Sequence, residues 1–136
     1  MATIWWEEPV AAPAERAWSA LRRIDLTHIL FSPVLVDSEL EGDIRTVTFA
    51  NGLVVRERVI TIDEQRRRIV YSVLGDMFEH HSASMTILPV DEANCRFIWI
   101  SDFSPDERIE MVQPLVEQGS RALTRNIEDG KAPRSM

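Results

Sequence analysis

The middle of the chain alternates between apolar and polar residues with a period of two, which is typical of β-strands. Short polar turns such as Asn51-Gly52 separate the alternating runs. Strands joined by such short turns pair antiparallel, because a parallel pair needs a long crossover. The pattern predicts six consecutive strands: Val34–Leu40, Ile44–Phe49, Leu53–Ile62, Arg67–Gly75, His80–Leu88 and Cys95–Phe103.

Helical spacing occurs on both sides of this strand region. A first strand over Thr3–Val10 precedes a short amphipathic helix over 13–24 and a second short helix capped by Asp25. The segment Ser104-Pro105-Asp106-Glu107 has the sequence of a capping box. It predicts a long helix over 106–129, about 36 Å in length, which is enough to cross a whole sheet.

These elements together predict one α+β domain over residues 1–129. We expect a six- to seven-stranded curved antiparallel sheet wrapped around the long C-terminal helix, with two short helices after the first strand. The physical reason is that the apolar stripe of the long helix must be buried against the concave face of the sheet. We expect residues 130–136, which include Gly130 and Pro133, to form a frayed C-terminal tail.

The alternation also predicts which side chains face the interior. A three-residue loop over Ala50–Gly52 pairs Val47 with Val55 and Arg45 with Glu57, so that odd-numbered residues face inward. A similar loop at 63–65 would put Tyr71 beside Glu57. The apolar and charged positions that this parity places inside are Arg45, Val47, Phe49, Val55, Glu57, Val59, His81, Ala83 and Met85.

Composition and net charge limit the kinds of partner that the protein is expected to bind. The 136 residues carry a formal net charge of −7, which offers no basic footprint for nucleic acid or an anionic membrane. No apolar run approaches the roughly 18 residues of a spanning helix, so we expect no membrane insertion. The single Cys95 cannot form an internal disulfide, and a cytoplasmic location is the expectation.

Four segments carry a resemblance to a known family. They are Ala12–Trp18 in the first helix, Gly42–Arg45 at a strand start, Val55–Val59, and Arg96–Pro105 before the long helix. The chain resembles the SRPBCC superfamily of helix-grip, START-like domains, and within it the polyketide cyclase/dehydrase branch. This resemblance implies a small hydrophobic or aromatic ligand, polyketide- or lipid-like, held between the sheet and the long helix.

The plant hormone-receptor branch of the same superfamily is similar to this chain in the Glu57-Arg58 strand and in the two strands that follow, and this likeness implies individual pocket residues. On the strands they are Val55, Glu57, Tyr71, Val73, His81 and Ala83, and on the helix they are Met111, Leu115 and Gly119. In the last strand it implies that Ile98 and Ile100 face inward, whereas the bulk of Phe97 and Trp99 favours the opposite face. Following the resemblance, we expect Ile98 and Ile100 in the cavity and Trp99 outside.

The outer face then carries apolar residues that a homodimer could bury: Val54, Ile60, Val70, Leu74 and Trp99.

Three functions stay open at this point. The first is a carrier that binds a hydrophobic molecule, with polar side chains selecting its substituents. The second is an aromatase/cyclase or dehydratase that uses Glu57 or His81 for proton transfer. The third is a protein-interaction module. Each residue also has a structural interpretation, in which Glu57 only pairs with Arg45 and His81 is only a rim residue.

We expect no cofactor and no metal. The sequence has no metal-ligand spacing, no phosphate loop and no nucleophile elbow. His80 and His81 cannot bind one ion, since adjacent strand residues point to opposite faces.

Overall fold

Seven antiparallel strands form a single curved sheet in the computed structural model, which describes residues 1–135. The order across the sheet is β1-β7-β6-β5-β4-β3-β2, so every strand after β2 pairs with its neighbour in sequence and β1 closes onto the last strand. This confirms the predicted antiparallel meander. The strands are β1 (Ala2–Val10), β2 (Leu35–Glu41), β3 (Ile44–Phe49), β4 (Val54–Asp63), β5 (Arg68–Val73), β6 (His80–Pro89) and β7 (Cys95–Ser104).

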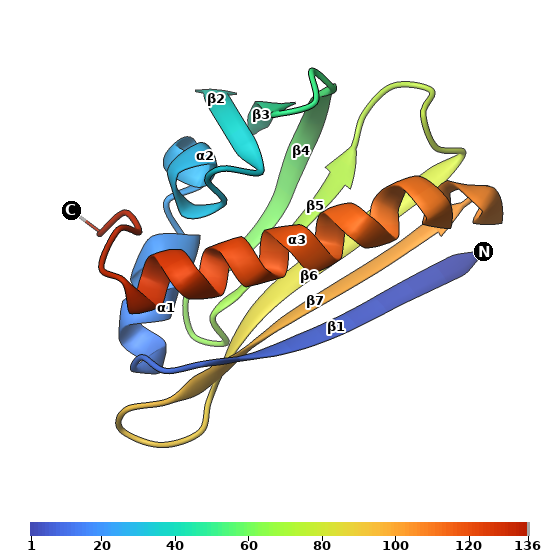
Figure 1. The fold of residues 1–136 in the computed structure, drawn as a ribbon. Coiled ribbons are helices and arrows are strands. Elements are labelled where there is room, and N and C mark those ends of the chain that lie inside the picture. Colours follow the sequence, from blue (N-terminus) through green and yellow to red (C-terminus); the bar gives the residue numbers. More distant parts are fainter. Residues whose placement is uncertain (136) are drawn as a thin grey trace.

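One long helix crosses the concave face of this sheet (Figure 1). It is α3 (Ile109–Glu128), and it follows a short 3₁₀ turn, η2 (Asp106–Arg108). Between β1 and β2 lie α1 (Ala14–Leu21), η1 (Ile24–Leu26) and α2 (Thr27–Leu30). The α+β helix-grip class, with short helices after the first strand, is therefore confirmed.

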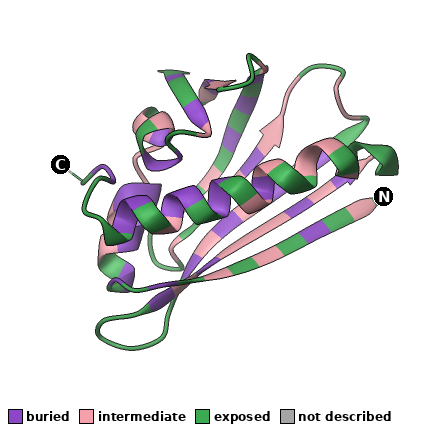
Figure 2. Ribbon diagram, viewed as in Figure 1, coloured by how far each residue is buried: buried purple, intermediate pink, exposed green. Residues whose placement is uncertain are grey.

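Burial follows the two periodicities that the sequence predicts. Buried and exposed residues alternate along the strands, and α3 turns one face toward the sheet (Figure 2). The carboxyl half of α3 is tightly packed, with Ala122 and Leu123 fully buried, while Met111 and Leu115 in its first half stay half-buried. The space between helix and sheet is thus filled at one end and looser at the other.

The β3–β4 hairpin has the predicted register. The backbone N–H of Phe49 donates to the carbonyl of Leu53 at 2.8 Å, and Arg45 lies opposite Glu57. Gly52 occupies the left-handed region with φ of 93°, which a side chain would strain. The three-residue loop therefore brings a cation and an anion together on the inner face.

The β4–β5 hairpin differs from the prediction. Tyr71 lies opposite Val59, and Val73 lies opposite Glu57, so Tyr71 is displaced by two residues from the predicted position beside Glu57. The reason is a longer turn together with a register shift between Val59 and Thr61, an irregularity that alternation cannot reveal. Odd-numbered residues of β5 still face the interior, and Tyr71 is one of them.

The prediction for β7 is wrong. Met85 lies opposite Trp99 and Ala83 opposite Ser101, and directly opposed residues share a face of the sheet. Trp99 and Ser101 therefore point inward, and the alternate residues Ile98 and Ile100 point to the convex face. The bulk of the aromatic side chains indicated the correct face, and the resemblance was out of step by one residue.

The helix start and the chain end also differ from expectation. Ser104 is the last residue of β7, and no side chain caps η2 or α3, so the capping box does not form. The tail is not frayed over 130–135, because the Arg16 guanidinium donates to the carbonyls of Ala132 and Pro133, both at 2.9 Å. Met136 lies outside the described residues.

Among the described residues, no helix has both the length and the apolar character needed to cross a membrane.

Candidate functional site

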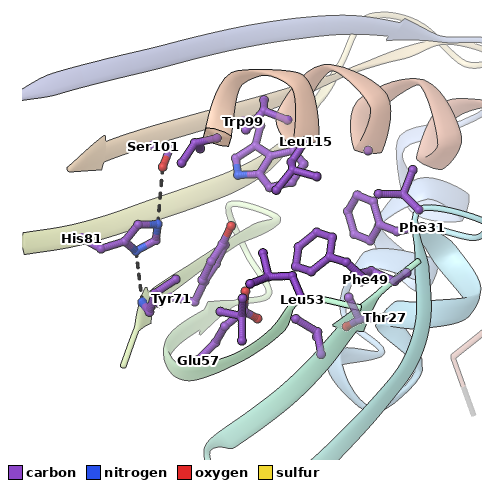
Figure 3. A pocket seen from close by; sticks show the side chains of 18 of the residues that line it. Thr27, Phe31, Phe49, Leu53, Glu57, Tyr71, His81, Trp99, Ser101 and Leu115 are labelled. Atoms are coloured by element: carbon purple, nitrogen blue, oxygen red, sulfur yellow. Dashed lines mark hydrogen bonds between the residues drawn. The ribbon is translucent and has the colours of Figure 1, made fainter. Parts of the chain in front are cut away.

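A cavity of about 90 Å³ lies between the inner face of the sheet and the first half of α3 (Figure 3). Its wall is mainly apolar, with Phe31 and Phe49 on one side and Trp99 and Leu115 on another. Only a few polar side chains interrupt this wall: Thr27, Arg45, Glu57, Tyr71, His81 and Ser101. The arrangement is typical of a site that encloses an apolar molecule and orients it by a small number of polar contacts.

Gly119 allows α3 to approach the sheet at this cavity. A Cβ at position 119 would lie 3.1 Å from Cζ3 of Trp99 and 3.5 Å from Cδ1 of Phe31. The Phe31 and Trp99 rings are themselves packed together, with centroids 5.7 Å apart. The glycine therefore serves close helix–sheet packing, and the two aromatic rings form one end of the cavity.

Arg45 and Glu57 form a buried ion pair in the wall. Oε1 of Glu57 accepts from Nε of Arg45 at 2.9 Å and lies 2.8 Å from Nη2. Nη1 of Arg45 donates to the hydroxyl oxygen of Thr27 at 2.8 Å. The side chains are 5% and 11% exposed, so neither charge is solvated, and each compensates the other.

Tyr71 presents its hydroxyl to the cavity beside this pair. The Arg45 guanidinium carbon lies 5.6 Å from the ring centroid, in the range of a cation–π contact. Burial, and then the negative charge of Glu57, raise the pKa of Tyr71 well above its ordinary value of 10.0. The hydroxyl therefore stays protonated. The indole Nε1–H of Trp99, which is buried and has no hydrogen-bond partner among the described residues, faces it (Figure 3).

His81 is held in one tautomer. Its Nδ1 accepts from the backbone N–H of Val73 at 3.1 Å, so the proton of the neutral ring resides on Nε2. Nε2 lies 3.5 Å from Oγ of Ser101, a long contact. Burial lowers the pKa of His81 to about 4, which keeps the ring neutral. His81 is thus a hydrogen-bond donor through Nε2–H, whereas Nδ1 already accepts from the Val73 N–H.

Two aromatic rings pack near His81. The ring centroids of Tyr71 and Phe78 lie 5.7 Å and 4.9 Å from that of His81. The cavity therefore combines a neutral imidazole, a neutral phenol and a compensated ion pair. No cluster of three or more potential metal ligands occurs in residues 1–135.

The structure brings most of the predicted site residues around this cavity. Those that line it are Arg45, Val47, Phe49, Val55, Glu57, Tyr71, Val73, His81, Met85, Met111, Leu115 and Gly119. Val59 and Ala83 are buried in the core but do not line the cavity. Ile98 and Ile100 lie outside it, on the convex face, as the strand pairing requires.

Sequence reasoning missed a second group of lining residues. It includes Thr27 at the start of α2, Phe31 directly after that helix, Leu53, Met77 and Phe78, and Trp99 and Ser101 on β7. Leu53 could have been found from its pairing with Phe49, and Trp99 from its bulk. Met77 and Phe78 lie in the connection between β5 and β6, where no periodicity predicts which side chains point inward.

One protein family matches nearly the whole chain. A family model described as polyketide cyclase / dehydrase and lipid transport matches residues 1–130. None of the curated proteins matches the sequence.

Solved structures share the fold at low sequence identity. XoxI from Bacillus cereus superposes with a TM-score of 0.85 at 19% identity, covering 98% of this chain and 100% of that one. Zhui aromatase/cyclase from a Streptomyces species gives 0.76 at 21% identity, covering 96% and 93%. Norcoclaurine synthase from Thalictrum flavum, in complex with dopamine and hydroxybenzaldehyde, gives 0.75 at 19% identity, covering 97% and 89%. At these identities the likeness concerns the fold.

Proposed function

The chain belongs to the polyketide cyclase / dehydrase and lipid transport family, and from that premise we propose that it binds a small hydrophobic or aromatic molecule in the cavity beneath α3. The observation that carries this proposal is the wall itself, which is mainly apolar and has a few polar groups at one side. Each Å² of apolar ligand surface removed from water contributes about 25 cal/mol, so enclosure supplies the affinity.

The size of the cavity bears on the ligand. At about 90 Å³ it is well below the roughly 300–1,000 Å³ of sites for drug-sized molecules. A ligand larger than a single ring therefore needs side chains to move. Met77, Met111 and Leu115 are half-buried wall residues, and methionine repacks easily because it is unbranched. We expect the cavity wall to open where these three side chains lie.

A cavity-filling substitution tests the proposal. Ethylbenzene, a small apolar probe, is titrated into the ¹⁵N-labelled protein, and amide shifts are followed by NMR. We expect saturable shifts in the wild type and their loss in Leu115→Trp, because the indole occupies the cavity. Gln118→Trp adds the same ring at an exposed position of α3 and should leave binding unchanged. Equal binding by Leu115→Trp would contradict the proposal.

A cyclase or dehydratase is the second candidate. The observation in its favour is that both contacts from Arg45 use Oε1 of Glu57, which leaves Oε2 as an acceptor without a partner among the described residues. Such a carboxylate could take a proton from a bound ketone. The likeness to an aromatase/cyclase supports this class through its fold. Loss of turnover in Glu57→Gln with ligand binding retained would favour the enzyme.

A further inference from the structure

A buried arginine such as Arg45 can bind an acidic ligand, but all three guanidinium nitrogens of Arg45 already contact other side chains. Nε and Nη2 contact Oε1 of Glu57, and Nη1 donates to Thr27. The ring of Tyr71 covers the guanidinium at 5.6 Å. Arg45, the one arginine or lysine among the described residues of the wall, is therefore neutralised and offers no free positive charge to a carboxylate or phosphate.

The donors that remain are neutral. The Nε1–H of Trp99 has no partner among the described residues and is shielded from water. A buried donor without a partner is unfavourable, and an acceptor on a ligand would satisfy it. The Tyr71 hydroxyl lies beside this N–H in the wall, and the indole is close enough to act on the Tyr71 pKa (Figure 3). One ligand oxygen at this point of the wall can therefore accept from both donors.

We propose that the cavity selects uncharged ligands that carry a hydrogen-bond acceptor such as a ketone oxygen, bound by Trp99 and Tyr71, and that it excludes carboxylates. This inference rests on the proposed function, since it concerns selectivity in the same cavity. An anion would enter a low-dielectric site in which the Arg45 guanidinium already has a counter-charge, so the desolvation of the anion would be uncompensated. A ketone carries no such cost and satisfies the indole N–H.

Three probes of similar size separate these contributions. Ethylbenzene is apolar, acetophenone replaces one methylene by a carbonyl, and benzoate carries a full charge at pH 7.5. Dissociation constants are measured by NMR titration of the whole chain. We expect acetophenone to bind at least roughly tenfold more tightly than benzoate, and the indole N–H resonance of Trp99 to move downfield with acetophenone but not with ethylbenzene.

Two substitutions change the selectivity in opposite ways. Trp99→Phe keeps the ring but removes the donor, so the affinity for acetophenone relative to ethylbenzene should fall several-fold. Trp5→Phe, on the exposed convex side, is its matched control. Glu57→Gln leaves Arg45 without its counter-charge and should raise the affinity for benzoate relative to acetophenone. Circular dichroism and amide spectra establish that each variant is folded.

The outcomes separate the two proposals. Absence of binding by all three probes would overturn the proposed function, and the selectivity with it. Benzoate binding as tightly as acetophenone to the wild type would overturn the selectivity alone and leave an apolar cavity. An unchanged acetophenone-to-ethylbenzene ratio in Trp99→Phe would also overturn it, because the indole N–H would then make no bond to the ligand oxygen.

Discussion

Single residues determine the polarity of the cavity. Arg45 and Glu57 are costly to bury alone, and together they present a nearly neutral wall. Removing one partner would leave an uncompensated charge, which typically costs about 3–5 kcal/mol. The pair is therefore both a structural element of the β3–β4 hairpin and the reason that the cavity has few free charges.

His81 links protein stability to pH. The unfolded chain takes up a proton near the ordinary histidine pKa of 6.5, whereas burial keeps the folded-state pKa near 4. Between these values the unfolded state binds more protons, so the free energy of unfolding falls as the pH drops from about 6.5 toward 4. We expect this residue to account for a loss of about 2–3 kcal/mol between pH 7.5 and 4.5.

Urea unfolding of His81→Asn tests this at both pH values. The asparagine can still accept from the Val73 N–H but does not titrate, so the pH-dependent loss should be smaller than in the wild type by that amount. His80→Asn changes the exposed neighbour and should behave nearly as the wild type. An identical pH dependence in His81→Asn and the wild type would show that His81 titrates normally.

Some residue positions in the site could be predicted from the sequence and others could not. The approach of Arg45 to Glu57 followed from alternation and one glycine-containing loop, which are local features. Trp99 lies on the face opposite to the one that the resemblance predicts, whereas its aromatic bulk indicates the correct face. The unpartnered indole N–H depends on packing between distant elements, and no local pattern contains it.

At the scale of elements, α3 is fixed to the α2–β2 region by one polar side chain. Nδ2 of Asn126 donates to the backbone carbonyls of Leu30 and Ser32, both at 2.8 Å. Together with Gly119 against Phe31, this contact holds the carboxyl half of the helix in place. The first half of α3 lacks such a contact with that region, which agrees with the cavity lying beneath it.

Asn126→Ala should therefore destabilise the whole fold. Two hydrogen bonds, one buried and one partly buried, are lost and two carbonyls lose their donor, for a cost of about 2–3 kcal/mol in the free energy of unfolding. Gln118→Ala, on the exposed side of α3, is the matched control and should change it by less than about 0.5 kcal/mol. Denaturant unfolding measures both, and a cost for Asn126→Ala no larger than the control's would refute the proposed fixation.

The strands were predictable and their irregularities were not. Alternation was sufficient to find the strands and the long helix, because each buries a single face. No periodic pattern in the sequence marks the register shift between Val59 and Thr61 or the 3₁₀ turn over Asp106–Arg108. In place of a serine cap, Ser104 continues β7, so a capping sequence alone did not fix the helix start.

At the scale of the molecule, the sheet has two different faces. The concave face forms the core and the cavity, whereas the convex face exposes Val54 and Ile60, each more than half accessible. A homodimer through this face stays a prediction, and the same apolar residues are the alternative place for an apolar probe to adsorb. The net charge of −7 adds to the exclusion of anionic ligands.

The most direct test of the account is the position of a bound probe. Acetophenone is added to ¹³C-methyl-labelled protein, and isotope-filtered NOEs between probe and protein are recorded. Binding in the cavity predicts NOEs to the methyl groups of Val47, Val55 and Leu115, which line it. NOEs confined to Val54 and Ile60 on the convex face, or no NOE under saturating probe, would contradict the account.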